Sequence, residues 1–213
     1  MAGSLALSVT LAATVRARTL NRVVASVGGT AITESDLKLE YRFERFMEGL
    51  PPSGVPDRGA RRVILNRLIS RTLLLEDLRN SGVTLKPSGE NARRALAQIQ
   101  KRFGSPARYR SALKELGMSE EEVLQRLEAY QQTLEYIDQR FRPVSPPSQA
   151  EVLAYYESSF VPKFRKLHQK PPPALEQVEA PIREILRQKK LDERLNEWLK
   201  EMRSTERVRI HPD

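Results

Sequence analysis

The stretch Val23-Val-Ala-Ser-Val-Gly-Gly-Thr-Ala-Ile-Thr-Glu-Ser-Asp36 decides how this chain begins to fold. Its two β-prone runs, Arg22–Val27 and Thr30–Ile32, flank Gly28-Gly29, and such a pair predicts a tight hairpin turn in which both central residues take positive φ. A lone hairpin is only marginally stable in water. The β-prone run Arg207–His211 therefore predicts a third strand, which pairs with the hairpin and ties the two ends of the chain together.

Everything between these strands carries the signals of helices. Thr33 or Ser35 is a suitable cap for a helix that runs to about Gly49. The next helix, from about Asp57 to Asn80, has a wide apolar arc and is expected to be the most buried. Capping residues and apolar spacing predict further helices at 88–103, 105–117, 119–141, 148–160 and 175–203. The fold class is therefore mainly α, with a small β-sheet formed by an N-terminal hairpin and a C-terminal strand.

Two of these helices have features that make sharper predictions. In the helix that Ser119 opens, the apolar residues alternate at spacings of four and three and so predict a heptad stripe: Val123, Leu127, Tyr130, Leu134, Ile137 and Phe141. In the last helix, Pro181 is expected to mark the first turn or a kink, because proline lacks the backbone N–H.

The composition favours a chain with much exposed helix surface. A net charge of +9 creates a field that attracts nucleic acid, anionic lipid or acidic polypeptide. The 27 acidic residues are nevertheless interleaved with the 36 basic ones, so most charges are expected on solvated helix faces with ion pairs.

Several kinds of chemistry are excluded by residues that the sequence lacks. Without cysteine there is no disulfide, thiolate metal site or cysteine nucleophile. His168 lies in a basic linker and His211 near the end of the chain, so neither is placed for a catalytic triad or a multi-histidine metal site. Gly28-Gly29 is better explained by a hairpin than by a phosphate-binding loop. The sequence predicts no catalytic centre, no cofactor, no metal and no small-molecule substrate.

The first residues indicate export. Leu5–Val15 is apolar, too short to span a bilayer, and typical of the apolar core of a signal peptide. Small or branched residues at Val15 and Ala17 place cleavage after Ala17, although no Lys or Arg precedes the apolar run. Residues 1–17 are thus predicted to be a signal peptide, the protein to be periplasmic or otherwise extracytoplasmic, and the mature chain to have no transmembrane span.

Aromatic and methionine side chains outside the regular stripes are candidates for an adaptable peptide-binding groove. Ordinary packing between helices is the alternative for each of them. The candidates are Tyr41, Phe43, Phe46, Met47, Tyr109, Met118 and Tyr155.

The order of segments resembles the SurA-type periplasmic chaperones, which are related to parvulin-type peptidyl-prolyl isomerases. The resemblance is carried by the hairpin with its Ser-Asp step, by three helical segments and by the final helix and strand: 23–36, 62–77, 109–130, 148–157 and 174–210. It implies an ATP-independent holdase that binds unfolded extracytoplasmic or outer-membrane polypeptides.

One departure from that family concerns its isomerase domain. In the family, a parvulin domain normally lies between the Tyr155-Tyr156 helix and the C-terminal helix, whereas here only VPKFRKLHQKPPP fills this place. The resemblance therefore implies a chaperone domain over 22–160, a basic proline-rich linker over 161–173 in place of the parvulin domain, and a returning helix and strand over 174–211. The protein is accordingly expected not to be an enzyme.

Other interpretations remain open from the sequence. One is an isomerase-related subunit that works with a separate catalytic domain, and another is a basic helical protein that binds nucleic acid. Long amphipathic helices and a short linker are also compatible with a domain-swapped homodimer.

Overall fold

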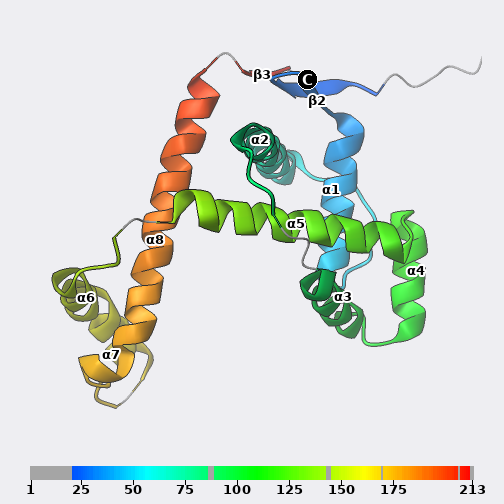
Figure 1. The fold of residues 1–213 in the computed structure, drawn as a ribbon. Coiled ribbons are helices and arrows are strands. Elements are labelled where there is room, and N and C mark those ends of the chain that lie inside the picture. Colours follow the sequence, from blue (N-terminus) through cyan, green and yellow to red (C-terminus); the bar gives the residue numbers. More distant parts are fainter. Residues whose placement is uncertain (1–20, 86–88, 143–144, 169, 206, 212–213) are drawn as a thin grey trace, which may run out of the picture.

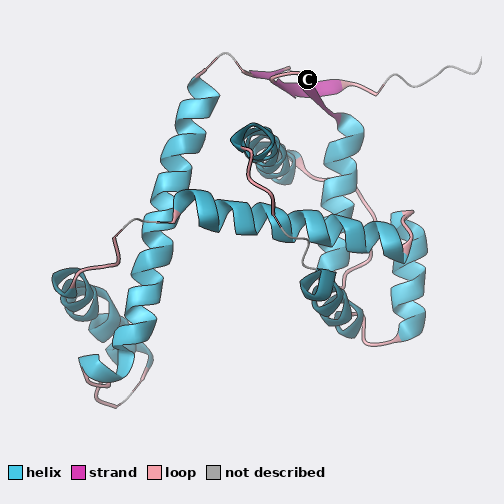
Figure 2. Cartoon of the chain, viewed as in Figure 1, coloured by secondary structure: helices cyan, strands magenta, loops and turns pink. Residues whose placement is uncertain are grey.

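The computed structural model describes residues 21–85, 89–142, 145–168, 170–205 and 207–211. The predicted signal peptide and Ser88 lie outside the described residues. Figures 1 and 2 show a helical molecule in which a small sheet joins the two ends of the described chain. The elements follow the order β1 (Val23–Val27), β2 (Thr30–Thr33), α1 (Glu34–Met47), α2 (Arg58–Ser81), α3 (Gly89–Arg102), α4 (Pro106–Leu116), α5 (Glu120–Phe141), α6 (Gln149–Tyr155), the π-helix η1 (Tyr156–Phe160), α7 (Val161–Leu167), α8 (Leu175–Ser204) and β3 (Val208–Ile210).

The predicted sheet is confirmed. Its strand order is β2-β1-β3, and both pairings are antiparallel, with Val27 opposite Thr30 on one side and opposite Val208 on the other. The turn differs from the prediction, because of its two glycines only Gly28 has positive φ, at +53°. A two-residue turn of type II′ needs positive φ at its first central residue alone, which agrees with positive φ at Gly28 and not at Gly29.

The start and end of α1 follow directly from the residues there. Thr33 is the N-cap, and it forms a capping box with Asp36, in which each side chain accepts a hydrogen bond from the other residue's backbone N–H. At the other end, the N–H groups of Gly49 and Leu50 donate to the carbonyls of Phe46 and Arg45, which is a Schellman motif. Gly49 adopts φ +76°, as the left-handed position after the helix requires.

Three apolar clusters hold the fold together. The first joins α1, α3, α4 and α5 and includes Phe43, Phe46 and Leu127. The second joins the sheet to α1 and α2, with Trp198 and Leu199 of α8 packed against it. The third joins α2, α5 and α8 through Leu74, Tyr136, Phe141 and Leu191. Helix α2 contributes to the second and third clusters, but the expectation that it is the most buried helix is wrong. Four of its 24 residues are buried, compared with four of the 14 in α1.

The predicted heptad stripe of α5 is wrong in its middle. Val123, Leu127 and Phe141 are buried, but Leu134 is 59% exposed, and Tyr136 is buried instead. A straight helix has 3.6 residues per turn, so a stripe with a period of 3.5 drifts around its surface. In α5 the buried face changes because the helix crosses from α3 to α2 and α8 along its length, as Figure 1 shows.

The helix that begins at Gln149 does not end at 160. It continues through η1 and α7 to Leu167, so the predicted linker 161–173 is helical over its first part. The N–H of Val161 donates to the carbonyl of Tyr156, five residues back, and this wider turn immediately precedes Pro162. A π-turn relieves the clash that a proline ring makes with the preceding helical turn, which explains how the helix passes Pro162.

Helix α8 connects the two ends of the molecule (Figure 1). Its first half packs against α6, and its second half reaches α5, α2 and the sheet. Pro181 lies inside α8 and not in its first turn, because the helix begins at Leu175. None of the helices in the described ranges has the length and apolarity to cross a lipid bilayer.

Candidate functional site

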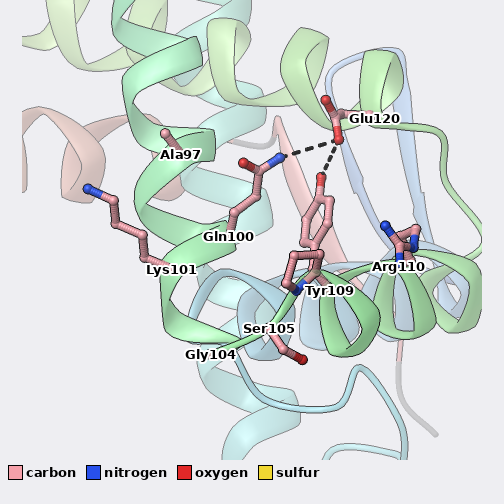
Figure 3. A pocket seen from close by; sticks show the side chains of 9 residues that line it. Ala97, Gln100, Lys101, Gly104, Ser105, Tyr109, Arg110 and Glu120 are labelled. Atoms are coloured by element: carbon pink, nitrogen blue, oxygen red, sulfur yellow. Dashed lines mark hydrogen bonds between the residues drawn. The ribbon is translucent and has the colours of Figure 1, made fainter.

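A pocket of about 700 Å³ lies at the corner between α3 and α4 (Figure 3). Small residues and one aromatic ring form much of its lining, and charged groups stand at its edges. The residues that line it are Ala97, Gln100, Lys101, Gly104, Ser105, Pro106, Tyr109, Arg110 and Glu120. We call this cavity the corner pocket.

The corner itself follows from four consecutive residues. Phe103 is buried and anchors the end of α3 in the first cluster, while Gly104 turns the chain with φ +73°. Ser105 then caps α4 by accepting a hydrogen bond from the N–H of Arg108, and Pro106 occupies the start of that helix. Because only Phe103 and Gly104 separate the end of α3 at Arg102 from the cap of α4 at Ser105, the two helices meet sharply and leave the pocket between them.

The polar side of the corner pocket is organised around Glu120. The phenol of Tyr109 donates a hydrogen bond of 2.9 Å to its Oε2, and the Nε2 of Gln100 lies 3.4 Å from the same oxygen (Figure 3). Burial, together with the nearby Glu120 carboxylate, raises the pKa of Tyr109 to about 12. The phenol therefore stays protonated near neutral pH and acts as a hydrogen-bond donor, not as a base.

The charged edges of the corner pocket are cationic. Lys101 and Arg110 are exposed and lie on α3 and α4. In the part of the chain that the structure describes, neither side chain forms an ion pair. Both charges thus remain available to an acidic group that enters the pocket.

A second pocket of about 330 Å³ borders the same corner. Phe103 and Ala112 contribute its apolar part, and Arg102 and Arg108 contribute cationic side chains. The α3–α4 corner is therefore bordered by two hollows, each lined by both apolar and basic residues.

Three of the predicted groove residues belong to the core. Phe43 and Phe46 have no exposed surface, and Tyr109 is 6% exposed with only its phenol edge at the corner pocket. Phe46 packs against the rings of Phe103 and Tyr109, at centroid distances of 5.2 and 5.8 Å. The prediction that Phe43 and Phe46 line a peptide-binding groove is wrong, because packing against other rings buries both side chains completely.

The other four predicted residues are half-buried. Met47 and Met118 pack against the first cluster, and Tyr41 packs against the second with the Arg45 guanidinium 5.8 Å from its ring. Tyr155 lies on α6, far along the chain from the corner pocket. The structure thus brings Tyr109 to the corner pocket and leaves peptide binding by Tyr41, Met47, Met118 and Tyr155 as a prediction.

One buried group was missed by the sequence reasoning. Glu40 of α1 has no exposed surface, and it accepts hydrogen bonds from Arg71 at 2.6 and 3.2 Å and from Arg126 and Tyr130. Burial alone would raise its pKa, but Arg71, Tyr130 and Arg126 more than offset this effect and hold the pKa of Glu40 below its usual value. Its position three residues from both Leu37 and Phe43 was the available signal, since this spacing puts the carboxylate on the apolar face.

The histidines are not assembled with other reactive groups. The ring of His168 lies tilted against that of Phe164, with 4.4 Å between the ring centroids. The Nε2 of His211 lies 3.4 Å from the Oγ of Ser26 at the sheet. Among the described residues, no cluster of three or more His, Asp or Glu side chains is placed to hold a metal ion.

Comparison with known proteins gives one family. Residues 3–134 match the SurA-like N-terminal domain, a range that includes the hairpin, α1 to α4 and most of α5. No parvulin-type isomerase family matches the chain, and a search of curated proteins finds no match. The matched range covers the corner pocket completely and more than half of the sequence, and the chain belongs to the SurA-like N-terminal domain family.

Proposed function

We propose that this protein is an ATP-independent holdase that binds unfolded extracytoplasmic polypeptides, including outer-membrane proteins, at the α3–α4 corner. The observation that carries the proposal is the corner pocket, which is open, mainly apolar and edged by unpaired cations, and which lies within the matched chaperone-family range. Apolar contacts of this kind bind many sequences weakly, which suits a protein that must release its clients.

The charges at the corner favour clients with acidic residues beside apolar ones. Lys101 and Arg110 stand at the edges of the corner pocket, and Arg108 stands at the second pocket. Exposed cations act mainly on the rate of encounter, and their effect falls with salt. We therefore expect client association to slow as ionic strength rises, while dissociation changes little.

The test measures the aggregation of a denaturant-unfolded outer-membrane β-barrel protein by light scattering after dilution. The wild-type protein should suppress aggregation at a severalfold molar excess. Ala97→Trp, which places an indole in the corner pocket, should remove most of this effect. Ala107→Trp is the matched control, because Ala107 is also exposed, lies on α4 and lines neither pocket.

Comparing the two variants tests whether clients bind at the corner pocket. Equal suppression by both variants places client binding elsewhere on the protein, and no suppression by the wild type refutes the holdase function. Circular dichroism of each variant is the control for folding, and substitutions at these exposed helix positions should leave the spectrum unchanged.

A further inference from the structure

A second surface with its own chemistry lies on α6, η1 and α7, far from the corner pocket (Figure 1). We call these elements, together with Lys170, the basic lobe. It packs on the first half of α8, at the end of that helix opposite the sheet. The basic lobe contributes no residue to the corner pocket, so its chemistry is a separate question.

The basic lobe carries a line of aromatic rings. Tyr156, Phe160 and Phe164 follow one another at helical spacing, with centroid distances of 5.7 and 5.8 Å, and His168 continues the line. None of these rings belongs to the three apolar clusters, and neither η1 nor α7 has a buried residue. One edge is fixed, because the Tyr156 hydroxyl donates to the carbonyl of Pro173 at 2.8 Å. The rings are half-buried, and Leu167 beside them is 76% exposed.

The charge of the basic lobe differs from that of the rest of the chain. No Asp or Glu occurs between Glu157 and Glu176, whereas four cations do: Lys163, Arg165, Lys166 and Lys170. Several arginines elsewhere are held by carboxylates, as in the pairs Arg71–Glu40 and Arg187–Asp138. Across the described ranges, none of the four lobe cations forms an ion pair.

The arrangement of these residues on α7 selects the kind of partner. Phe160, Phe164 and Leu167 share one helix face because they are spaced by four and three. Lys163 borders this face beside Leu167, whereas Arg165 and Lys166 lie further round the helix, one on each side of the opposite face. Aromatic and leucine side chains on one face, bordered by Lys and Arg with long apolar stems, form the pattern of helices that lie in a membrane interface.

We propose that the basic lobe docks on an anionic lipid surface, with α7 lying in the plane of the headgroups. A surface of anionic headgroups presents negative charge to Lys163 beside the apolar face, and Arg165 and Lys166 reach the same headgroups through their long apolar stems. It accepts the ring edges and Leu167 at the boundary of the acyl chains. A second copy of this chain does not fit, because the same four positive charges would face each other.

The experiment measures flotation of the full chain with vesicles of phosphatidylethanolamine and phosphatidylglycerol, compared with vesicles of phosphatidylcholine. Binding should be at least tenfold stronger to the anionic vesicles and should weaken as salt rises. The variant K163Q/R165Q/K166Q should lose about fivefold in partitioning for each charge removed, or on the order of 100-fold together. Leu167→Ser should lower the partitioning onto anionic vesicles about tenfold. It should leave the fold intact, because this side chain is already exposed.

The matched control is R93Q/K114Q/K200Q, which removes the same charge from three exposed positions outside the basic lobe. Equal losses in the two triple variants would show that net charge alone drives binding, and this overturns the proposal. Binding of the full chain to polyglutamate or to an oligonucleotide, without binding to anionic vesicles, would also overturn the proposal. Suppression of client aggregation should be unchanged by K163Q/R165Q/K166Q. A failure of the lipid-binding proposal can therefore be distinguished from a failure of the holdase proposal.

Discussion

Replacing Glu40 with glutamine should be the most damaging isosteric change to this fold. The carboxylate is fully buried and accepts hydrogen bonds from side chains on two other helices, Arg71 of α2 and Arg126 and Tyr130 of α5. Glu40→Gln removes the charge and leaves two guanidinium groups without their anion. Breaking a buried ion pair from one side costs about 3–5 kcal/mol. Because the side chains of Arg71 and Arg126 are 19% and 24% exposed and regain some water, we expect the lower end, about 3 kcal/mol.

This loss is measured by urea unfolding followed by circular dichroism, and at this chain length it corresponds to a fall in Tm of about 6–12 °C. Glu90→Gln is the control. Its ion pair with Arg94 is at the surface, with the two side chains 81% and 69% exposed, so the change should be below about 0.5 kcal/mol. A loss below about 1 kcal/mol for Glu40→Gln would refute the reasoning that the buried carboxylate joins the three helices.

The same variant gives a pH test with a definite sign. The folded pKa of Glu40 lies below its ordinary value of 4.5, so the unfolded chain takes up this proton first as the pH falls. The stability that Glu40 provides is therefore complete above about pH 5 and declines as the pH falls through 4.5 toward the folded pKa. The difference in unfolding free energy between the wild type and Glu40→Gln should be constant near neutrality and shrink in acid, and a constant difference down to pH 3 contradicts the assignment.

Three further changes test other parts of the structure. Gly49→Ala should cost about 1–3 kcal/mol in urea unfolding, because φ is +76° there and a Cβ would lie 2.6 Å from the Cβ of Arg102; a neutral result would contradict the Schellman ending of α1. Ser119→Ala should cost about 1 kcal/mol, since it removes the cap of α5, and Ser119→Asp should restore most of that loss. Tyr109→Phe should cost about 1 kcal/mol by removing the donor to Glu120, yet it should leave suppression of client aggregation intact; a loss of suppression would instead give the hydroxyl a direct part in binding.

Much of the fold was predictable because its signals are local. Local residues are sufficient to form the capping box at Ser119, the Gly-Gly turn and the left-handed Gly49. The structure confirms the helices and strands that begin or end at these residues. The path of the chain through Pro162 was not predictable in this way. A π-turn requires the preceding residues to shift their hydrogen bonds, and no residue type in Tyr156–Phe160 demands that shift.

The candidate site was predictable only in outline. Aromatic residues such as Phe43, Phe46 and Tyr109 were candidates for the lining of a groove, but the sequence does not show whether a ring faces the core or the surface when several helices can pack against it. Phe46 is buried because Phe103 and Tyr109 approach it from two other helices or their ends. The corner pocket arises from the angle between α3 and α4, a property of the packed helices and not of either helix alone.

The pairing of β3 with β1 also fixes the order in which the molecule is completed. The contact between Ser26 and His211 spans 185 residues, so it forms only after nearly the whole chain is available. A polypeptide that emerges from its N-terminus can pair β1 with β2 and build α1 to α5 early, but one edge of β1 stays uncovered until Val208–Ile210 arrive. An uncovered edge is a template for strands from other chains, so the interval before closure is the time at which this protein is itself most prone to aggregate.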